Sequence, residues 1–118
     1  MRLNHINLTV TDVLAAANFL STYFGLHNQG GNAGMTLLTD VEDYSGMILT
    51  LMKGKAQDVQ YPPTFHVGFS LASREEVDAI HTRMHADGIL ADPPGDTGHS
   101  YGFYVVAPGG FQVEVGSA

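Results

Sequence analysis

Three side chains in this sequence have the chemistry to hold a metal ion together, although they lie far apart along the chain. His5 and His66 each stand near the start of a segment in which apolar and polar residues alternate, and Glu114 stands between two valines. Such alternation is typical of β-strands, and a glutamate between two apolar residues points to the opposite face of its strand. Two imidazoles and one carboxylate hold iron(II) or manganese(II) and leave coordination positions open for a substrate.

Each of these residues also has a simpler interpretation when it is taken alone. A glutamate on an edge strand often faces solvent, and histidines are commonly hydrogen-bonded without any metal. Only the combination of the three favours a metal site. Iron(II) and manganese(II) are the favoured ions, while zinc and nickel remain open because affinity order and metal supply decide much of the outcome.

A repeat in the sequence places the two histidines at equivalent positions. Residues 5–10 align with residues 66–71, and each segment is followed by a predicted helix that ends in Gly-Leu or Gly-Ile. Residues 46–51 align with residues 110–115 in the same way. Two copies of a unit of about 60 residues predict one pseudo-symmetric domain rather than a solenoid.

The elements that must position these residues can be predicted from periodicity and capping signals. The helices are expected after Asp12, ending at Gly25, and after Ser73, ending at Gly88. The expected loops are a glycine-rich turn before residue 35, a linker at 53–63 and a Pro/Gly loop at 92–100, and the expected strands cover residues 3–10, 35–39, 46–52, 65–71, 101–107 and 111–115. The result is a single α+β domain over residues 1–118, with modules at about 1–55 and 62–118 whose curled sheets would face each other around a cleft.

Composition excludes several classes of function. The chain of 118 residues is 44% hydrophobic and 14% charged, as in a folded protein, and its formal charge of −7 disfavours nucleic acid and anionic membrane surfaces as partners. The absence of cysteine excludes disulfides and thiolate chemistry. The N-terminal residues lack the apolar block of a signal peptide, so a cytoplasmic location is expected.

Four stretches of the chain resemble the vicinal oxygen chelate superfamily, which includes glyoxalase I, extradiol dioxygenases, fosfomycin-resistance enzymes and bleomycin-resistance proteins. The stretches are Leu3–Ile6, Tyr23–Leu26, Phe65–Val67 and Tyr104–Val115. The last is similar to the family signature Phe-x-Asp-Pro-Asp-Gly-x-x-x-Glu, with Ala107 and Gly109 in place of the acidic residues. The resemblance implies paired βαβββ modules, a homodimer with sites inside the curled sheets, and His5, His66 and Glu114 as metal ligands.

The fourth ligand position of that family falls on Thr50 in this chain, or on Leu49 if the register shifts by one. Neither residue is a carboxylate, which argues against the glyoxalase I reaction. The fosfomycin enzymes need basic groups around a phosphonate, whereas this chain has only five Lys and Arg residues. The remaining His-His-Glu set is similar to that of the extradiol dioxygenases.

Other polar residues are candidates for catalysis or for the substrate pocket. His99, Tyr101 and Tyr104 are candidates for acid/base and oxyanion roles, and the alternative is that they are ordinary loop and strand residues. Small or polar residues on the inward faces of the strands would line the pocket, namely Asn7, Thr9, Thr50 and Ser70.

Two functions therefore stand open at this point. The preferred one is a metal-dependent enzyme, dioxygenase-like rather than glyoxalase I, whose small-molecule substrate chelates the metal through two neighbouring oxygens. The alternative is a metal-free protein of the bleomycin-resistance type that sequesters a ligand.

Overall fold

The computed structural model describes residues 1–118, which form two compact units. The first unit contains residues 1–61 and 108–110, and the second contains residues 62–107 and 111–118. Each unit combines one α-helix with a four-stranded mixed sheet. This confirms the α+β class and the two βαβββ modules. Neither helix has the length and apolar content needed to cross a membrane.

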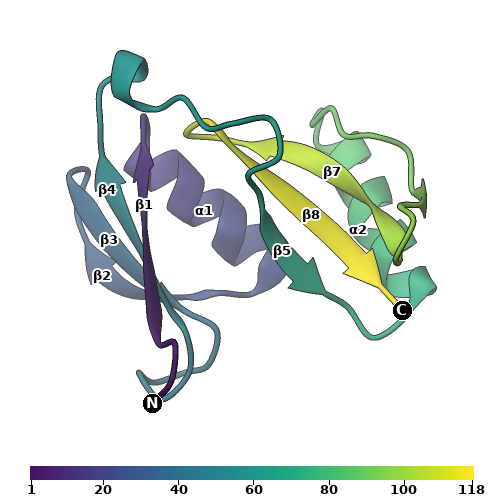
Figure 1. The fold of residues 1–118 in the computed structure, drawn as a ribbon, viewed down its shortest axis with the longest axis horizontal. Helices are drawn as coiled ribbons and strands as arrows, with labels where there is room; N and C mark the ends of the chain where they lie inside the picture. The colour runs from purple at the N-terminus through teal and green to yellow at the C-terminus, as the bar shows by residue number, and fades with distance from the viewer. The chain divides into compact units, whose positions relative to one another are not determined.

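The sheet of the first unit has the strand order β1-β4-β3-β2 (Figure 1). Strand β1 runs parallel to β4, and the other neighbours are antiparallel. Helix α1 lies against β2, β3 and β4, and a short 3-10 helix, η1, follows the last strand. The bounds are β1 (His5–Val10), α1 (Val13–Phe24), β2 (His27–Gly31), β3 (Met35–Thr39), β4 (Ile48–Lys53) and η1 (Ala56–Asp58).

The caps predicted for α1 are present. The Asp12 carboxylate accepts a hydrogen bond from the Ala15 amide at 3.0 Å, and Gly25 takes the left-handed conformation with φ of 68°. The apolar face of α1 packs on the inward-turned side chains of the sheet. The fully buried apolar residues of this core include Leu8, Val10, Val13, Ala16, Leu20, Leu38 and Leu51.

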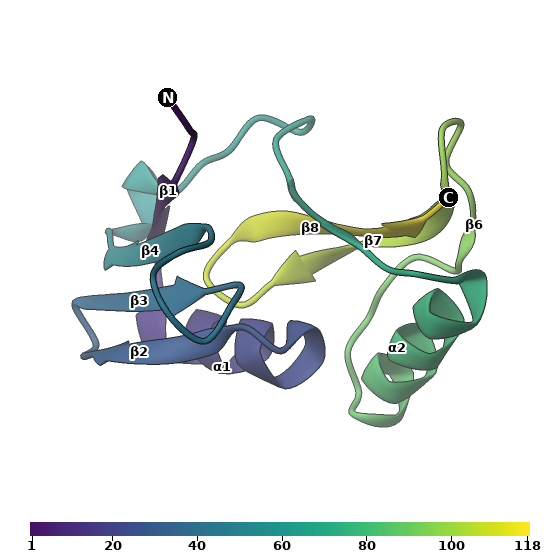
Figure 2. The ribbon, with the colours of Figure 1, turned by 90° about the horizontal axis from the view of Figure 1, so that it is seen from below.

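The sheet of the second unit repeats this plan with the order β5-β8-β7-β6. Its strands β8, β7 and β6 are labelled in Figure 2. Strand β5 is parallel to β8, and the β8-β7 and β7-β6 pairs are antiparallel. Helix α2 packs on β7 and β8. The bounds are β5 (Val67–Ser70), α2 (Arg74–Ala86), β6 (Gly95–Asp96), β7 (Tyr101–Ala107) and β8 (Phe111–Ser117).

Helix α2 begins with the predicted capping box. The Glu76 amide donates to the Ser73 hydroxyl at 3.2 Å, and the Glu76 carboxylate accepts from the Ala72 amide at 2.9 Å. Val77 and Met84 of this helix are fully buried. His81 is half-buried, and its ring lies edge-on to the Phe103 ring with 5.0 Å between the ring centres.

Two strands lie where the sequence predicted turns or loops. Strand β2 covers His27–Gly31, which includes the first part of the predicted glycine-rich turn, and β6 lies within the predicted Pro/Gly loop. Both are polar and mostly exposed, so they carry no hydrophobic alternation that periodicity could detect. They form because each pairs with an adjacent antiparallel strand, β3 or β7.

Candidate functional site

Glu114 is the centre of a cluster of polar side chains in the second unit. Strand β8 holds it between two buried valines, and its side chain retains 14% of its exposure. The alternation of the strand directs the carboxylate away from α2, onto the open face of the sheet. There one carboxylate oxygen accepts a hydrogen bond from the Tyr104 hydroxyl at 2.5 Å, across the β7-β8 ladder in which the two residues are direct partners.

His66 stands beside the same carboxylate oxygen in a defined orientation. Its Nδ1 donates to the Thr64 carbonyl at 3.0 Å, since a carbonyl can only accept. Its Nε2 lies 3.3 Å from the Glu114 carboxylate, and its ring meets the Tyr104 ring edge-on at 5.6 Å. When the ring carries a single proton at Nδ1, the Nε2 lone pair faces a carboxylate oxygen. Two such acceptors are favourable neighbours only when a proton or a metal cation lies between them.

His99 approaches the other oxygen of the carboxylate from the loop before β7. Its Nε2 lies 3.4 Å from Glu114, and 68% of the side chain is exposed. The loop is held by bonds from Thr97 to the Ser100 carbonyl, from the amide at 2.9 Å and from the hydroxyl at 3.0 Å. His99 is therefore placed at the solvent side of the cluster.

The electrostatics of the cluster follow from these contacts. The hydrogen bond from Tyr104 lowers the pKa of Glu114, burial opposes this, and His99 and His66 lower that pKa further. The same bond raises the pKa of Tyr104 above its ordinary value, with burial and the negative charge of Glu114 acting in the same direction. At neutral pH the carboxylate is thus ionised and the phenol keeps its proton.

A hollow lies next to these groups on the same face of the sheet. Its volume is about 360 Å³, within the range of small-molecule sites, and it is open to solvent. It is lined by Pro63, Thr64, His66, Tyr104 and Gln112. Gln112 was absent from the candidates chosen from the sequence, although it precedes Glu114 by two residues and a strand period of two puts both on one face.

The structure does not bring Tyr101 to this cluster. Tyr101 stands three residues before Tyr104 in one strand, so the two rings project from opposite faces. The Tyr101 hydroxyl donates to Asp78 of α2 at 2.5 Å, and the Arg74 guanidinium lies 5.0 Å from its ring centre. Ser70, by contrast, lies on the Glu114 face, since Gly68 pairs with Glu114 and Ser70 with Gly116.

The first unit carries its candidates on the corresponding face of β1 and β4. The exposed His5 donates from Nδ1 to the Asn4 side-chain oxygen at 2.7 Å, so its tautomer matches that of His66. Asn7 donates to the Met52 sulfur at 2.9 Å. The hydroxyl of Tyr61 bonds both backbone groups of Thr9, at 3.1 Å and 2.8 Å.

The strand registers identify which residue of the first unit corresponds to Glu114. In the second unit Gly68, two residues after His66, pairs with Glu114. In the first unit Asn7, two residues after His5, pairs with Thr50. Thr50 rather than Leu49 is therefore the equivalent position.

The candidate ligands are divided between the two units. His5 belongs to the first unit, whereas His66 and Glu114 belong to the second. Within either unit, no three histidine or carboxylate side chains are arranged so as to hold a metal ion. The second unit thus holds the pair of His66 and Glu114, and the first unit holds a histidine of the same tautomer.

Comparisons with known proteins place this fold in a family. The family model described as the Glyoxalase/Bleomycin resistance protein/Dioxygenase superfamily matches residues 2–115. No curated protein matches the chain.

Three solved structures illustrate the likeness. A possible glyoxalase from Bacillus cereus is 50% identical, with a TM-score of 0.86 and 98% of each chain covered. The fosfomycin resistance protein FosX from Listeria monocytogenes, crystallised with Mn(II) and sulfate, is 23% identical, with a TM-score of 0.78 and 99% and 90% covered. A lactoylglutathione lyase from Agrobacterium tumefaciens is 22% identical, with a TM-score of 0.74 and 99% and 93% covered. The last two likenesses concern the fold.

Proposed function

Because this chain belongs to the Glyoxalase/Bleomycin resistance protein/Dioxygenase superfamily, we propose that it is a metal-dependent enzyme whose ion is held by His5, His66 and Glu114. The favoured ions are iron(II) and manganese(II), which accept this donor set. The Mn(II) in the Listeria FosX crystal supports a divalent ion in this fold generally. The substrate would be a small molecule that chelates the ion through two neighbouring oxygens.

The observation that carries this proposal is the orientation of His66 toward Glu114. Its Nδ1 bond to Thr64 directs Nε2 at a carboxylate oxygen 3.3 Å away. A backbone carbonyl on the second ring nitrogen is the usual outer-shell partner of a metal-ligating histidine. The Asn4 side chain plays this part for His5. Both rings thus present Nε2, and the carboxylate adds the anionic donor, so the residues fit a divalent ion.

When bound, the ion would act as a Lewis acid on the chelated oxygens. The surrounding side chains would hold the protons. Tyr104 keeps its proton beside Glu114, because the pKa of its phenol is raised. Its single O–H is donated to the carboxylate, so it would donate to a bound oxygen only by leaving Glu114. His99 is exposed beside the carboxylate and is placed to exchange a proton between substrate and solvent. Tyr101 has no part in this proposal, because it faces α2.

The proposed reaction is dioxygenase-like or a related metal-assisted reaction rather than that of glyoxalase I. Thr50 stands in register where a carboxylate would be needed for the isomerase, and its hydroxyl is a poor proton acceptor. Oxygen uptake by the iron(II)-loaded protein with catechol-type substrates tests this assignment. Consumption of one O₂ per substrate cleaved is the expected result, and turnover of a hemithioacetal without oxygen uptake would contradict it.

Elemental analysis of the purified protein tests the metal itself. We expect about one iron or manganese per site, lost in His66→Ala and retained in a matched His85→Ala variant, whose histidine lies exposed on α2. A folded chain that takes up neither ion at saturating concentration, and yet binds a small apolar ligand, would instead support the metal-free sequestering protein.

We also propose that the protein acts as a homodimer, because a small sheet shields a bound substrate better when a second subunit covers it. Light scattering at micromolar concentration is the measurement. A monomeric mass together with full activity would contradict this part of the proposal and leave the metal assignment standing.

A further inference from the structure

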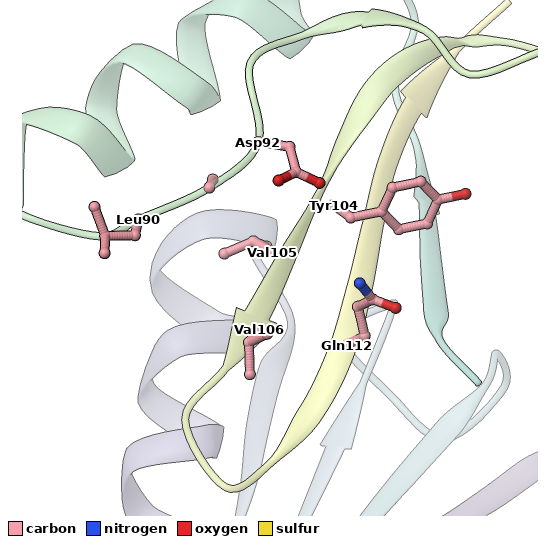
Figure 3. A pocket seen from close by; sticks show the side chains of 7 residues that line it. Leu90, Asp92, Tyr104, Val105, Val106 and Gln112 are labelled. Atoms are coloured by element: carbon pink, nitrogen blue, oxygen red, sulfur yellow. The ribbon is translucent and has the colours of Figure 1, made fainter. Parts of the chain in front are cut away.

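Two neighbouring hollows on the open face of the second sheet share the same two side chains. The first is the one beside His66 described above. The second, of about 210 Å³, extends from Tyr104 and Gln112 over β7 (Figure 3). Its other lining residues are Leu90, Ala91, Asp92, Val105 and Val106. A ligand that is seated at His66 and Glu114 and is longer than the first hollow would therefore pass Gln112.

The side-chain amide of Gln112 lines both hollows and is open to a hydrogen-bonding ligand. It pairs with Val106 in the β7-β8 ladder and is half-buried. Its side-chain amide makes no hydrogen bond within the protein, whereas the nearby side chains of Tyr104 and Glu114 bond each other. An amide offers two donors and one acceptor oxygen, and leaving them unpaired in a closed complex is costly.

The charges around the hollows limit which ligand groups can bind beside Gln112. The second unit has seven carboxylates and two arginines. Both arginines lie on α2, and Arg74 stands over Tyr101 on the face that is turned toward that helix. No lysine or arginine lines either hollow, and Asp92 adds a carboxylate to the second. An anionic substituent would therefore find no counter-ion there and would be repelled.

We propose that Gln112 is a specificity-determining residue that selects substrates with an uncharged polar group beyond the chelating oxygens, and that carboxylate or phosphonate substituents are rejected. This inference rests on the proposed function, because the chelating end of the substrate is taken to sit at His66 and Glu114. A site built to hydrogen-bond a neutral group discriminates strongly against ligands that leave its amide unpaired.

Calorimetric titration of the Mn(II)-loaded protein with three catechols tests the inference. The probes are 3,4-dihydroxybenzamide, 3,4-dihydroxybenzoate and 4-methylcatechol, which share the chelating oxygens and differ in the substituent. We expect the amide to bind about tenfold more tightly than the benzoate. Equal affinities for these two probes would overturn the inference.

Variants at Gln112 separate its role from general effects. Gln112→Leu should weaken the benzamide about fivefold to tenfold and leave 4-methylcatechol unchanged. Gln112→Lys should reverse the order of the benzamide and the benzoate. Gln57→Leu is the matched control, because Gln57 is exposed on η1 and lines neither hollow, and it should change nothing.

The outcomes distinguish this inference from the proposed function. Bound Mn(II) and bound catechols with a preference that Gln112→Leu leaves intact would contradict the specificity role alone. Thermal unfolding of each variant is the control that tests whether the fold is retained. A folded wild-type chain that binds no Mn(II) would contradict the proposed function, and the specificity inference would fall with it.

Discussion

The two sheets have the same strand order and register but differ in the chemistry of their open faces. In the second unit Glu114 pairs with Tyr104 and Gly68, and His66 turns its ring toward the carboxylate. In the first unit Thr50 occupies the same position, with Leu37 and Asn7 as its partners. The carboxylate and phenol of one module correspond to a hydroxyl and an aliphatic side chain in the other.

This difference shows what one carboxylate adds to a strand. The Glu114 carboxylate contacts one phenol and two imidazoles, and these contacts lower its pKa. Without such a group, the Asn7 side chain of the first sheet donates to the sulfur of Met52, and the His5 ring hydrogen-bonds its neighbour Asn4. The repeat therefore reuses one backbone arrangement, while the polar function of the face depends on a single substituted position.

The largest contrast is expected between the helix-facing positions of β3 and β7. Phe103 and Thr36 occupy equivalent places, partnered by Val115 and Leu51, and each is 1% exposed. Phe103→Ala should lower the free energy of unfolding by about 3–5 kcal/mol, because it leaves a cavity under α2. Thr36→Ala should cost about 1 kcal/mol through the loss of its bond to the Asn32 carbonyl. Urea unfolding followed by circular dichroism measures both, and equal losses would contradict the comparison.

Replacing the polar group at the two equivalent strand positions should change metal affinity at Glu114 and leave it unchanged at Thr50. Under the proposed function, Glu114→Gln removes the anionic donor and should weaken Mn(II) binding by about a hundredfold or more, about 2.7 kcal/mol. The matched Thr50→Val variant should bind Mn(II) as the wild type does. Metal titration with elemental analysis is the measurement. A large loss in Thr50→Val would show that the first sheet supplies a ligand at this position.

Removing the phenol that the first sheet lacks should alter the pH dependence of stability. The Tyr104 bond depresses the pKa of Glu114, so its contribution is present above the ordinary carboxyl range and is lost as pH falls through the depressed pKa. The same bond raises the pKa of Tyr104, so this part persists below the ordinary phenol pKa and is lost as pH rises through the raised one.

Tyr104→Phe should therefore cost about 1–2 kcal/mol between about pH 5 and pH 10, and less on either side. The pKa of Glu114, measured by carbon NMR, should rise in this variant. Leu37→Phe at the equivalent position of the first sheet serves as the control and should leave that titration unchanged. An unshifted Glu114 pKa in Tyr104→Phe would break the assignment of the bond.

The smallest expected difference concerns the helix caps. Asp12→Ala and Ser73→Ala each remove one side-chain bond to a helix amide and should each cost about 1 kcal/mol. Glu76 still caps the Ala72 amide in Ser73→Ala, so the loss in α2 should be lower by a few tenths of a kcal/mol. Thermal unfolding of the two variants side by side measures the difference, and a larger loss for Ser73→Ala would refute this ranking.

Much of the fold followed from local patterns in the sequence. Asp12, Gly25 and Ser73 act as the predicted caps because capping depends on bonds within a few residues. The alternating segments formed the predicted strands, and the repeat placed His5 and His66 alike. The candidate metal set came from residue types and from the resemblance, whereas the assignment of Thr50 to the family's fourth ligand position came from the resemblance alone. The strand register favours Thr50 over Leu49 at that position.

Other features depended on contacts between distant segments. Strands β2 and β6 exist because of their partners, and the sequence predicted neither. Three aromatic or imidazole residues near β7 looked alike as candidates, yet only Tyr104 and His99 reach Glu114, while Tyr101 bonds Asp78. The period of two separates the faces of a strand, but which face meets a helix is settled only when the sheet packs.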